Sequence, residues 1–144
     1  MQDVEILSEI AVDCGLRIHQ QLGPGLLESV YEALMASSLA RRGLSVERQK
    51  IIPIEFDGIA FAEGFRADLI VEAQLLIEIK SIDRLAAVHG KQLLTYLRLA
   101  KQPLGLLMNF GAATFKEGVK RVVNRHTNFA SSRLRVNQIS STQP

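Results

Sequence analysis

The sequence predicts one α/β domain of the α+β type, in which a central mixed sheet with a three-strand meander is flanked by helices. Three observations predict this fold class. Apolar residues recur at helical spacing before residue 43. Three extended segments then follow one another between residues 46 and 81. A helical segment and a short apolar strand come next, which is the pattern of a crossover connection.

Two helices are expected first, over Val4–Leu22 and from about Leu26 to Arg42, with Gly43 as a C-terminal cap. Gly23-Pro24-Gly25 should separate them, because glycine permits positive φ and proline removes a backbone donor. The expected inward side chains of the second helix are Leu27, Val30, Tyr31, Ala33 and Leu34.

The meander is expected over Val46–Phe56, Ile59–Glu72 and Leu75–Ser81. Asp57-Gly58 is a common two-residue hairpin turn, and Gly64 suggests a bulge in the return strand. The second turn, at Ala73-Gln74, lacks a residue that readily takes positive φ, so its tightness stays open.

A helix over Arg84–Ala100 and a buried strand over Leu104–Phe110 should complete the crossover. The segment Phe115–Asn124 fits either a helix or an edge strand. Residues 126–144 are polar and are expected to form a loose tail after a single domain of residues 1–125.

Composition excludes some classes of protein. A net charge of +2 gives little attraction for a polyanion, so a nucleic-acid partner would need a local basic patch. A lone cysteine, Cys14, cannot form an internal disulfide and reads as a core residue. Because the sequence has neither a signal segment nor a membrane-length apolar run, a cytoplasmic protein without membrane contact is expected.

Ionisable side chains interrupt the apolar strands at Asp68, Glu78 and Lys80. Alternate residues of a strand share a face, so Glu78 and Lys80 should project together, and an antiparallel pairing could bring Asp68 beside them. Such charges need a cation or one another if they are buried. A solvated edge ion pair and a structural ion-pair network are the alternatives to a functional site.

Two further features have two readings each. Glu28 lies in the first turn of a helix, where the helix dipole alone favours a carboxylate. The alternative is that the glycine-framed turn directs Glu28 at a site on the sheet. A basic cluster is either a solvated face or a surface that contacts phosphates. Its members are Lys116, Lys120, Arg121 and Arg125.

The stretch Gly25–Tyr31, GLLESVY, matches the signature of the GxxExxY family, a branch of the PD-(D/E)XK nuclease superfamily. The order of elements, with Asp68 and Glu-x-Lys on the meander, also resembles that superfamily's restriction-endonuclease-like core. The resemblance runs from about Ile6 to Asn124, with Ala67 in place of the proline in the superfamily's name.

The resemblance implies Asp68 and Glu78 as metal ligands, with Glu28 beside them, and Lys80 as the catalytic lysine. Gln92 and Tyr96 resemble a Q-x-x-x-Y motif that shapes the active site and holds the substrate strand. These oxygen ligands, to which the Ile79 carbonyl could add another, suit Mg²⁺ or Mn²⁺. His19, the histidine closest to Glu28 in sequence, is expected to be structural.

Two functions follow as hypotheses. The first is a metal-dependent nuclease that acts on DNA, or less readily RNA, through a metal-activated water. The second is a nuclease-like module that binds nucleic acid or a partner protein without cutting. Many small nucleases dimerise to reach two strands, which leaves a homodimer open although the sequence holds no interface signal.

Overall fold

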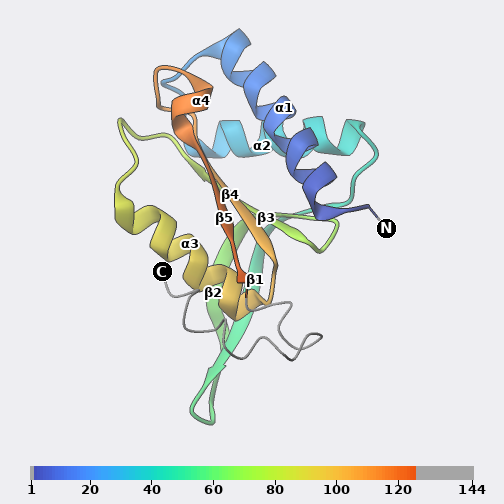
Figure 1. Cartoon of the computed structure of the whole chain (residues 1–144), viewed down its shortest axis with the longest axis vertical. Helices are drawn as coiled ribbons and strands as arrows, with labels where there is room; N and C mark the ends of the chain where they lie inside the picture. The colour runs from blue at the N-terminus through green and yellow to red at the C-terminus, as the bar shows by residue number, and fades with distance from the viewer. Residues whose placement is uncertain (1, 126–144) are drawn as a thin grey trace.

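The computed structural model describes residues 2–125, and the expected tail at 126–144 lies outside the described residues. Figure 1 shows the elements in place. In chain order they are α1 (Val4–Leu22), α2 (Glu28–Arg41), β1 (Val46–Phe56), β2 (Ile59–Val71), β3 (Leu75–Lys80), α3 (Ala87–Ala100), β4 (Leu104–Asn109), α4 (Phe115–Gly118) and β5 (Val119–Val123).

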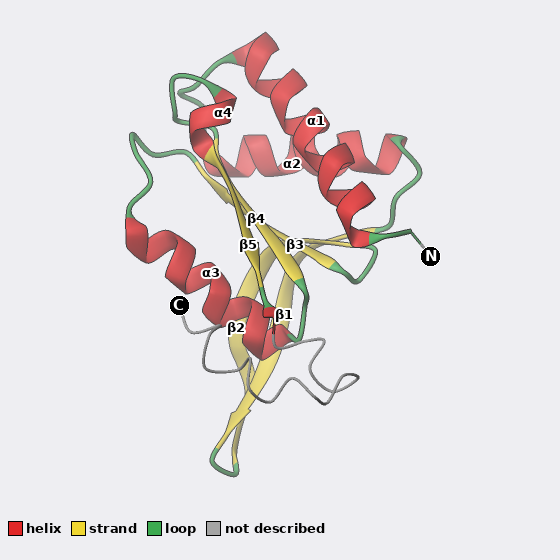
Figure 2. Ribbon diagram, viewed as in Figure 1, coloured by secondary structure: helices red, strands yellow, loops and turns green. Residues whose placement is uncertain are grey.

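The five strands form one mixed sheet in the order β1-β2-β3-β4-β5 (Figure 2). The meander β1-β2-β3 is antiparallel, β3 and β4 are parallel, and β5 returns antiparallel to β4. Because parallel neighbours need a crossover, α3 connects β3 to β4 across one face of the sheet. The predicted fold class, a mixed sheet with a three-strand meander flanked by helices, is confirmed.

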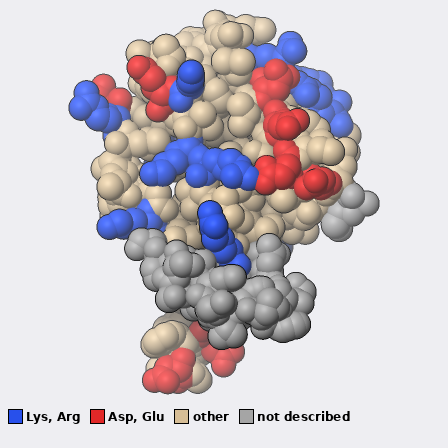
Figure 3. Space-filling model, in the orientation of Figure 1, with Lys and Arg blue, Asp and Glu red and all other residues tan. Residues whose placement is uncertain are grey.

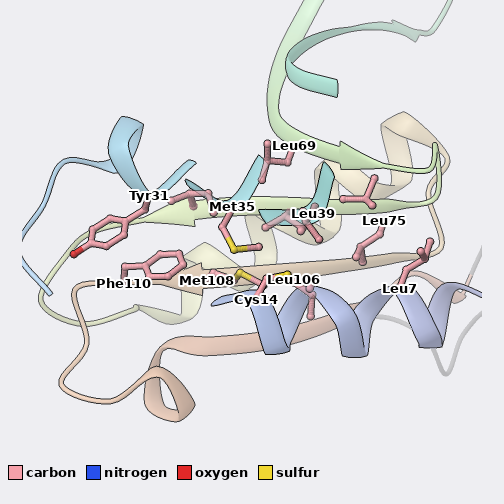
Figure 4. Close-up of a cluster of buried hydrophobic side chains, with 14 of the residues drawn as sticks. Leu7, Cys14, Tyr31, Met35, Leu39, Leu69, Leu75, Leu106, Met108 and Phe110 are labelled. Atoms are coloured by element: carbon pink, nitrogen blue, oxygen red, sulfur yellow. The ribbon is translucent and has the colours of Figure 1, made fainter. Parts of the chain in front are cut away.

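Each face of the sheet has its own core. The larger core lies under α1 and α2 and contains Leu75 of β3 (Figure 4) together with Ile77 and Ile79 of the same strand. Cys14 is buried in it, as expected. The smaller core lies under α3 and contains Leu76. Strand alternation therefore directs Glu78 and Lys80 to the α3 face.

The predicted inward face of α2 is partly wrong. Helix α1 has the expected bounds, but α2 begins at Glu28, and Leu27 is its extended N-cap residue with 73% of its surface exposed. Val30 is exposed as well. The four buried residues of α2 are Tyr31, Glu32, Met35 and Leu39. Tyr31, Met35 and Leu39 are four residues apart and form the stripe that packs in the core. Leu27 precedes the helix, and Val30 lies off this stripe.

The hairpin between β1 and β2 has the predicted turn and bulge. Asp57 and Gly58 both take positive φ, 55° and 79°. The register shifts between Ile52 and Ile54, opposite Gly64. An added Cβ at Gly64 would lie 2.4 Å from the Ile54 side chain, so the bend requires glycine.

Residues 53–64, which we term the hairpin arm, extend away from the three longer helices (Figures 1 and 2). Phe56, Ile59 and Phe61 are 77%, 58% and 50% exposed there. Glu55, Asp57 and Glu63 lie on the same arm, and Figure 3 shows acidic side chains at its end.

Three local features differ from the sequence-based prediction or were left undecided by it. The second meander turn places Glu72 and Ala73, neither of them glycine, at φ of 52° and 55°. Helix α3 begins at Ala87 rather than Arg84, because the Ala86 amide donates to His89 Nδ1 and so closes the helix start. The segment after Phe115 holds both a helical turn and a strand.

Candidate active site on the α3 face

Asp68 and Glu78 lie beside each other across the β2–β3 pair. The register pairs Leu69 with Ile77, which sets Asp68 opposite Glu78. The Asp68 amide donates to Glu78 Oε1 at 3.4 Å, and the Ile79 amide donates to Asp68 Oδ2 at 2.8 Å. The Asp68 carboxylate therefore accepts a bond that a backbone carbonyl would accept in a regular ladder.

The β1–β2 pairing is interrupted at the same place. Arg48 pairs with Leu69 and Lys50 with Ala67, while Gln49 and Asp68 are missing from the register. Gln49 has a φ of 48°, outside the extended region of a strand. Irregularities of this kind redirect a side chain at the edge of a ladder. Here the redirected side chain is Asp68.

Burial and the neighbouring carboxylate raise the pKa of Glu78 to about 8. Desolvation is the largest cause, followed by the charge of Asp68 and a hydrogen bond to its side chain, while Lys80 acts in the opposite direction. In the protein without a cation, Glu78 is therefore mostly protonated at neutral pH.

Lys80 is half-buried on the same face as Glu78. Within residues 2–125, its side chain forms neither a hydrogen bond nor an ion pair, although its backbone carbonyl accepts from the Phe110 amide at 2.8 Å. Its charge still favours the ionised form of Glu78. The ammonium group is thus near the carboxylates and is not held by them. Ile79 is different, since its side chain packs in the core under α1 and α2.

Tyr96 of α3 lies over the two carboxylates. Its ring stacks on Phe65 of β2, with centroids 4.2 Å apart. Burial raises the pKa of the Tyr96 phenol, and the charges of Glu78 and Asp68 raise it further. Gln92 lies one helical turn earlier and is exposed. Tyr96 therefore lies close enough to the carboxylate pair to be affected by its charge, whereas Gln92 is placed only on the same helix.

Glu28 lies at the end of β3, not between Asp68 and Glu78. Its Oε2 accepts a hydrogen bond from the Ser81 amide at 3.3 Å. It lines a hollow of about 520 Å³ together with Asp83 and the Gly-Pro turn. No group of three His, Cys, Asp or Glu side chains in residues 2–125 is arranged to hold a metal ion. The structure thus joins two of the three expected carboxylates.

Tyr31 fixes the turn that carries Glu28. Its hydroxyl donates to the Gly23 carbonyl at 2.6 Å and accepts from the Leu26 amide at 3.2 Å. Gly25 takes a φ of 113°, which only glycine adopts readily. Two residues of the GLLESVY stretch therefore shape the turn that ends in Glu28.

The basic cluster is divided between the two faces of the sheet. Arg121 forms an ion pair with Glu5 of α1. Lys120 points the other way, toward Gly90 of α3, where an added Cβ would lie 3.1 Å from its Nζ. Lys116 and Arg125 are exposed at the two ends of β5. The four residues therefore do not form one continuous surface that could contact phosphates.

His19 has the structural role expected for it. It is buried, its Nε2 lies 2.9 Å from the Ala112 carbonyl oxygen, and its ring is near Phe110 and Phe115. It is not directed at the carboxylate pair.

Sequence reasoning missed Glu32 and Gln49. Glu32 is only 6% exposed, and it accepts hydrogen bonds from Arg48 and Gln49 of β1. Gln49 in turn donates to Asp68. The one available signal was the position of Glu32, four residues after Glu28 and so on the same side of α2. No local pattern marks Gln49.

The five-strand mixed sheet with its flanking helices has the restriction-endonuclease-like fold. The family model of the PD-(D/E)XK nuclease superfamily matches residues 5–122. The chain belongs to the PD-(D/E)XK nuclease superfamily, which indicates nuclease activity and a nucleic-acid substrate. Comparisons with curated proteins and with solved structures gave no match. None of the helices in residues 2–125 has the length and apolar character needed to cross a membrane.

Proposed function

We propose that the protein is a metal-dependent nuclease that hydrolyses phosphodiester bonds in DNA, or less readily in RNA, and that residues 1–125 form its nuclease domain. The observation that carries this proposal is the contact between Asp68 and Glu78 on the α3 face. Two adjacent carboxylates, one of them buried with a pKa raised to about 8, are stabilised together by a cation.

The donor set fits a hard divalent cation such as Mg²⁺ or Mn²⁺. Asp68 and Glu78 supply carboxylate oxygens, and we propose the Ile79 carbonyl and Glu28 as further oxygen ligands. Since Glu28 bonds to the Ser81 amide, its participation requires that bond to be exchanged. When bound, the cation would activate water and neutralise charge on the phosphodiester.

The chain's own side chains have separate roles in this proposal. The ammonium group of Lys80, which has no hydrogen-bond or ion-pair partner in the described part of the chain, orients the attacking water or donates to the phosphate oxygens as charge builds on them. Tyr96 lies near the carboxylates, and we propose that Tyr96 and Gln92 of α3 together hold the substrate strand. Lys120 contacts a backbone phosphate on the same face.

We further propose that the chain is a GxxExxY-type member of the superfamily. Gly25 and Tyr31 shape the turn, and Glu28 follows it directly. The contact of Glu28 with Ser81 keeps the signature carboxylate next to the end of β3. In this proposal, the signature residues hold a carboxylate next to the end of the strand that carries Glu78 and Lys80.

The second candidate is a nuclease-like module that binds without cutting. The observation that favours it is the missing third carboxylate at the Asp68–Glu78 pair in residues 2–125. Such a module would use the same face and the same nucleic acid, and it would bind without any need for Mg²⁺ or Mn²⁺.

Cleavage assays distinguish the two candidates. The wild-type protein is expected to cut single- or double-stranded DNA, or RNA, in Mg²⁺ or Mn²⁺. The double variant Glu78→Ala, Lys80→Ala should lose cleavage and keep binding. Glu55→Gln, a carboxylate change on the hairpin arm, is the matched control and should cut normally. If the wild-type protein binds these substrates and leaves them all intact, the enzyme is refuted in favour of the binding module.

A further inference from the structure

Gln49 stands in the middle of a chain of hydrogen bonds that connects α2 to Asp68. Its Nε2 donates to Glu32 Oε1 at 2.6 Å and to Asp68 Oδ1 at 3.1 Å. The other oxygen of Asp68 accepts from the Ile79 amide. Both oxygens of the Asp68 carboxylate therefore have a donor, one on β1 and one on β3.

The direction of these hydrogen bonds follows from the donor capacity of the Gln49 amide group. An amide nitrogen has two hydrogens, and each of them points at a different carboxyl oxygen, so a flipped Gln49 amide would place its own oxygen against two acceptor oxygens. Glu32 is buried, and its second oxygen accepts from Arg48 at 3.2 Å. A buried carboxylate satisfied in this way is a rigid anchor for Gln49.

The backbone at Gln49 is strained, and its position is unusual. The described residues contain four other non-glycine residues with positive φ, at Asp57, Glu72, Ala73 and Lys101. Three of these lie in the turns that connect neighbouring strands and the fourth caps α3, whereas Gln49 lies inside β1. A left-handed conformation costs an L-residue roughly 1–2 kcal/mol. Strain inside a strand persists where surrounding contacts enforce it, as they do in functional sites.

We propose that Gln49 is a positioning residue that orients the Asp68 carboxylate, with Glu32 as its anchor. This inference rests on the proposed nuclease function and deepens it. The strained residue opens the β1–β2 ladder at Asp68, and its amide then fixes the rotation of the released carboxylate. Removing a residue that orients a metal ligand through a hydrogen bond typically lowers metal affinity or activity about 10–100-fold.

The substitution Gln49→Gly separates positioning from simple structural support. Glycine adopts a φ of 48° without strain, so the backbone kink is retained while the amide is lost. The melting temperature should stay unchanged or rise. The Mn²⁺ affinity measured by calorimetry and kcat should each fall about 10–100-fold. If Gln49 only supports the fold, the melting temperature falls, and activity per folded molecule stays at the wild-type value.

Lys101→Gly is the matched control. Lys101 has a φ of 58°, close to that of Gln49, and it caps the C-terminal end of α3. The same relief of strain is expected there, with Mn²⁺ affinity and kcat unchanged. A Lys101→Gly variant that also lost Mn²⁺ affinity would assign the effect of Gln49→Gly to glycine itself and would overturn the proposal.

Crystal structures of the metal-free wild-type and Gln49→Gly proteins give a readout that needs no activity. In the variant, Asp68 should leave its contact with the Ile79 amide, and an unmoved Asp68 overturns the inference. If the wild-type protein neither binds Mn²⁺ nor cuts nucleic acid, the proposed function fails. A displaced Asp68 would then still support the positioning role, so the two failures are distinguishable.

Discussion

The pKa of Glu78 links the candidate site to the stability of the protein. Burial and Asp68 raise this pKa from 4.5 to about 8. Between these two pH values the folded protein binds more protons than the unfolded chain, so the free energy of unfolding of the metal-free protein should decrease as pH rises. The contribution of Glu78 is complete below pH 4.5 and is lost as pH passes 8.

We therefore expect the wild-type protein in chelator to unfold at lower denaturant concentration at pH 8 than at pH 5. Glu78→Gln, which cannot ionise, should show a clearly weaker dependence. Mg²⁺ or Mn²⁺ should restore stability at pH 8 in the wild-type protein only, because cation binding requires the ionised carboxylate. Equal pH dependence in the two proteins would contradict the burial of Glu78 as its cause.

The residues of the site differ in how visible they are in the sequence. Asp68, Glu78 and Lys80 could be found because strand alternation and an antiparallel meander bring them together. Gln49 and Glu32 could not. Their contact joins residues 17 positions apart on a helix and a strand, and it depends on a positive φ at a glutamine, which no composition or spacing signals.

At the level of elements, the turn between α1 and α2 depends on one hydroxyl group. Tyr31 is fully buried, and its ring stacks on Phe110 with centroids 4.5 Å apart. Tyr31→Phe keeps this packing and removes both hydrogen bonds to the turn. We expect the free energy of unfolding to fall by about 1 kcal/mol, measured by denaturant titration. Cleavage should also weaken, because Glu28 follows this turn.

Tyr96→Phe removes the same atom from the other tyrosine of the chain. Tyr96 makes no side-chain hydrogen bond within residues 2–125, so the free energy of unfolding of the variant should be unchanged while its cleavage activity falls. A loss of stability in Tyr96→Phe as large as that in Tyr31→Phe would show that the two hydroxyls do not differ in this way.

Element boundaries followed the sequence wherever a local rule decided them. The helical stripe of α1 and the turn at Asp57-Gly58 are such cases. The exposed side of α2 was mispredicted because the anchoring of Tyr31 on the turn, a contact across eight residues, determines which residues face inward. Glu72-Ala73 forms a tight turn against its local preference, since the adjoining strands hold it closed.

On the scale of the whole molecule, the sheet separates two surfaces with different roles. Helices α1 and α2 cover one face (Figure 1), and the carboxylate pair lies on the other. On the face drawn in Figure 3, Lys and Arg side chains lie among acidic groups rather than in one wide basic field. Contacts with nucleic acid on this face are therefore expected to depend on individual lysines and arginines.

Lys120 and Arg121 test this separation, since they are adjacent in sequence and point to opposite faces. In a Glu78→Gln background, Lys120→Gln should weaken nucleic-acid binding and reduce its salt dependence by about one counterion. Arg121→Gln should leave binding unchanged, because its partner is Glu5 of α1. Fluorescence titrations over a range of salt concentrations measure both, and a larger effect of Arg121→Gln would place the substrate on the α1 side.

The hairpin arm bears on how the protein behaves at high concentration. Phe56, Ile59 and Phe61 form an exposed apolar segment with strong strand preference, on a hairpin whose outer strand ends the sheet. Segments of this type promote stacking of one chain on another unless charges interrupt them. Glu55, Asp57 and Glu63 are the interrupting charges here. We therefore expect these three carboxylates, which take no part in the carboxylate pair on the sheet, to oppose self-association of the hairpin arm.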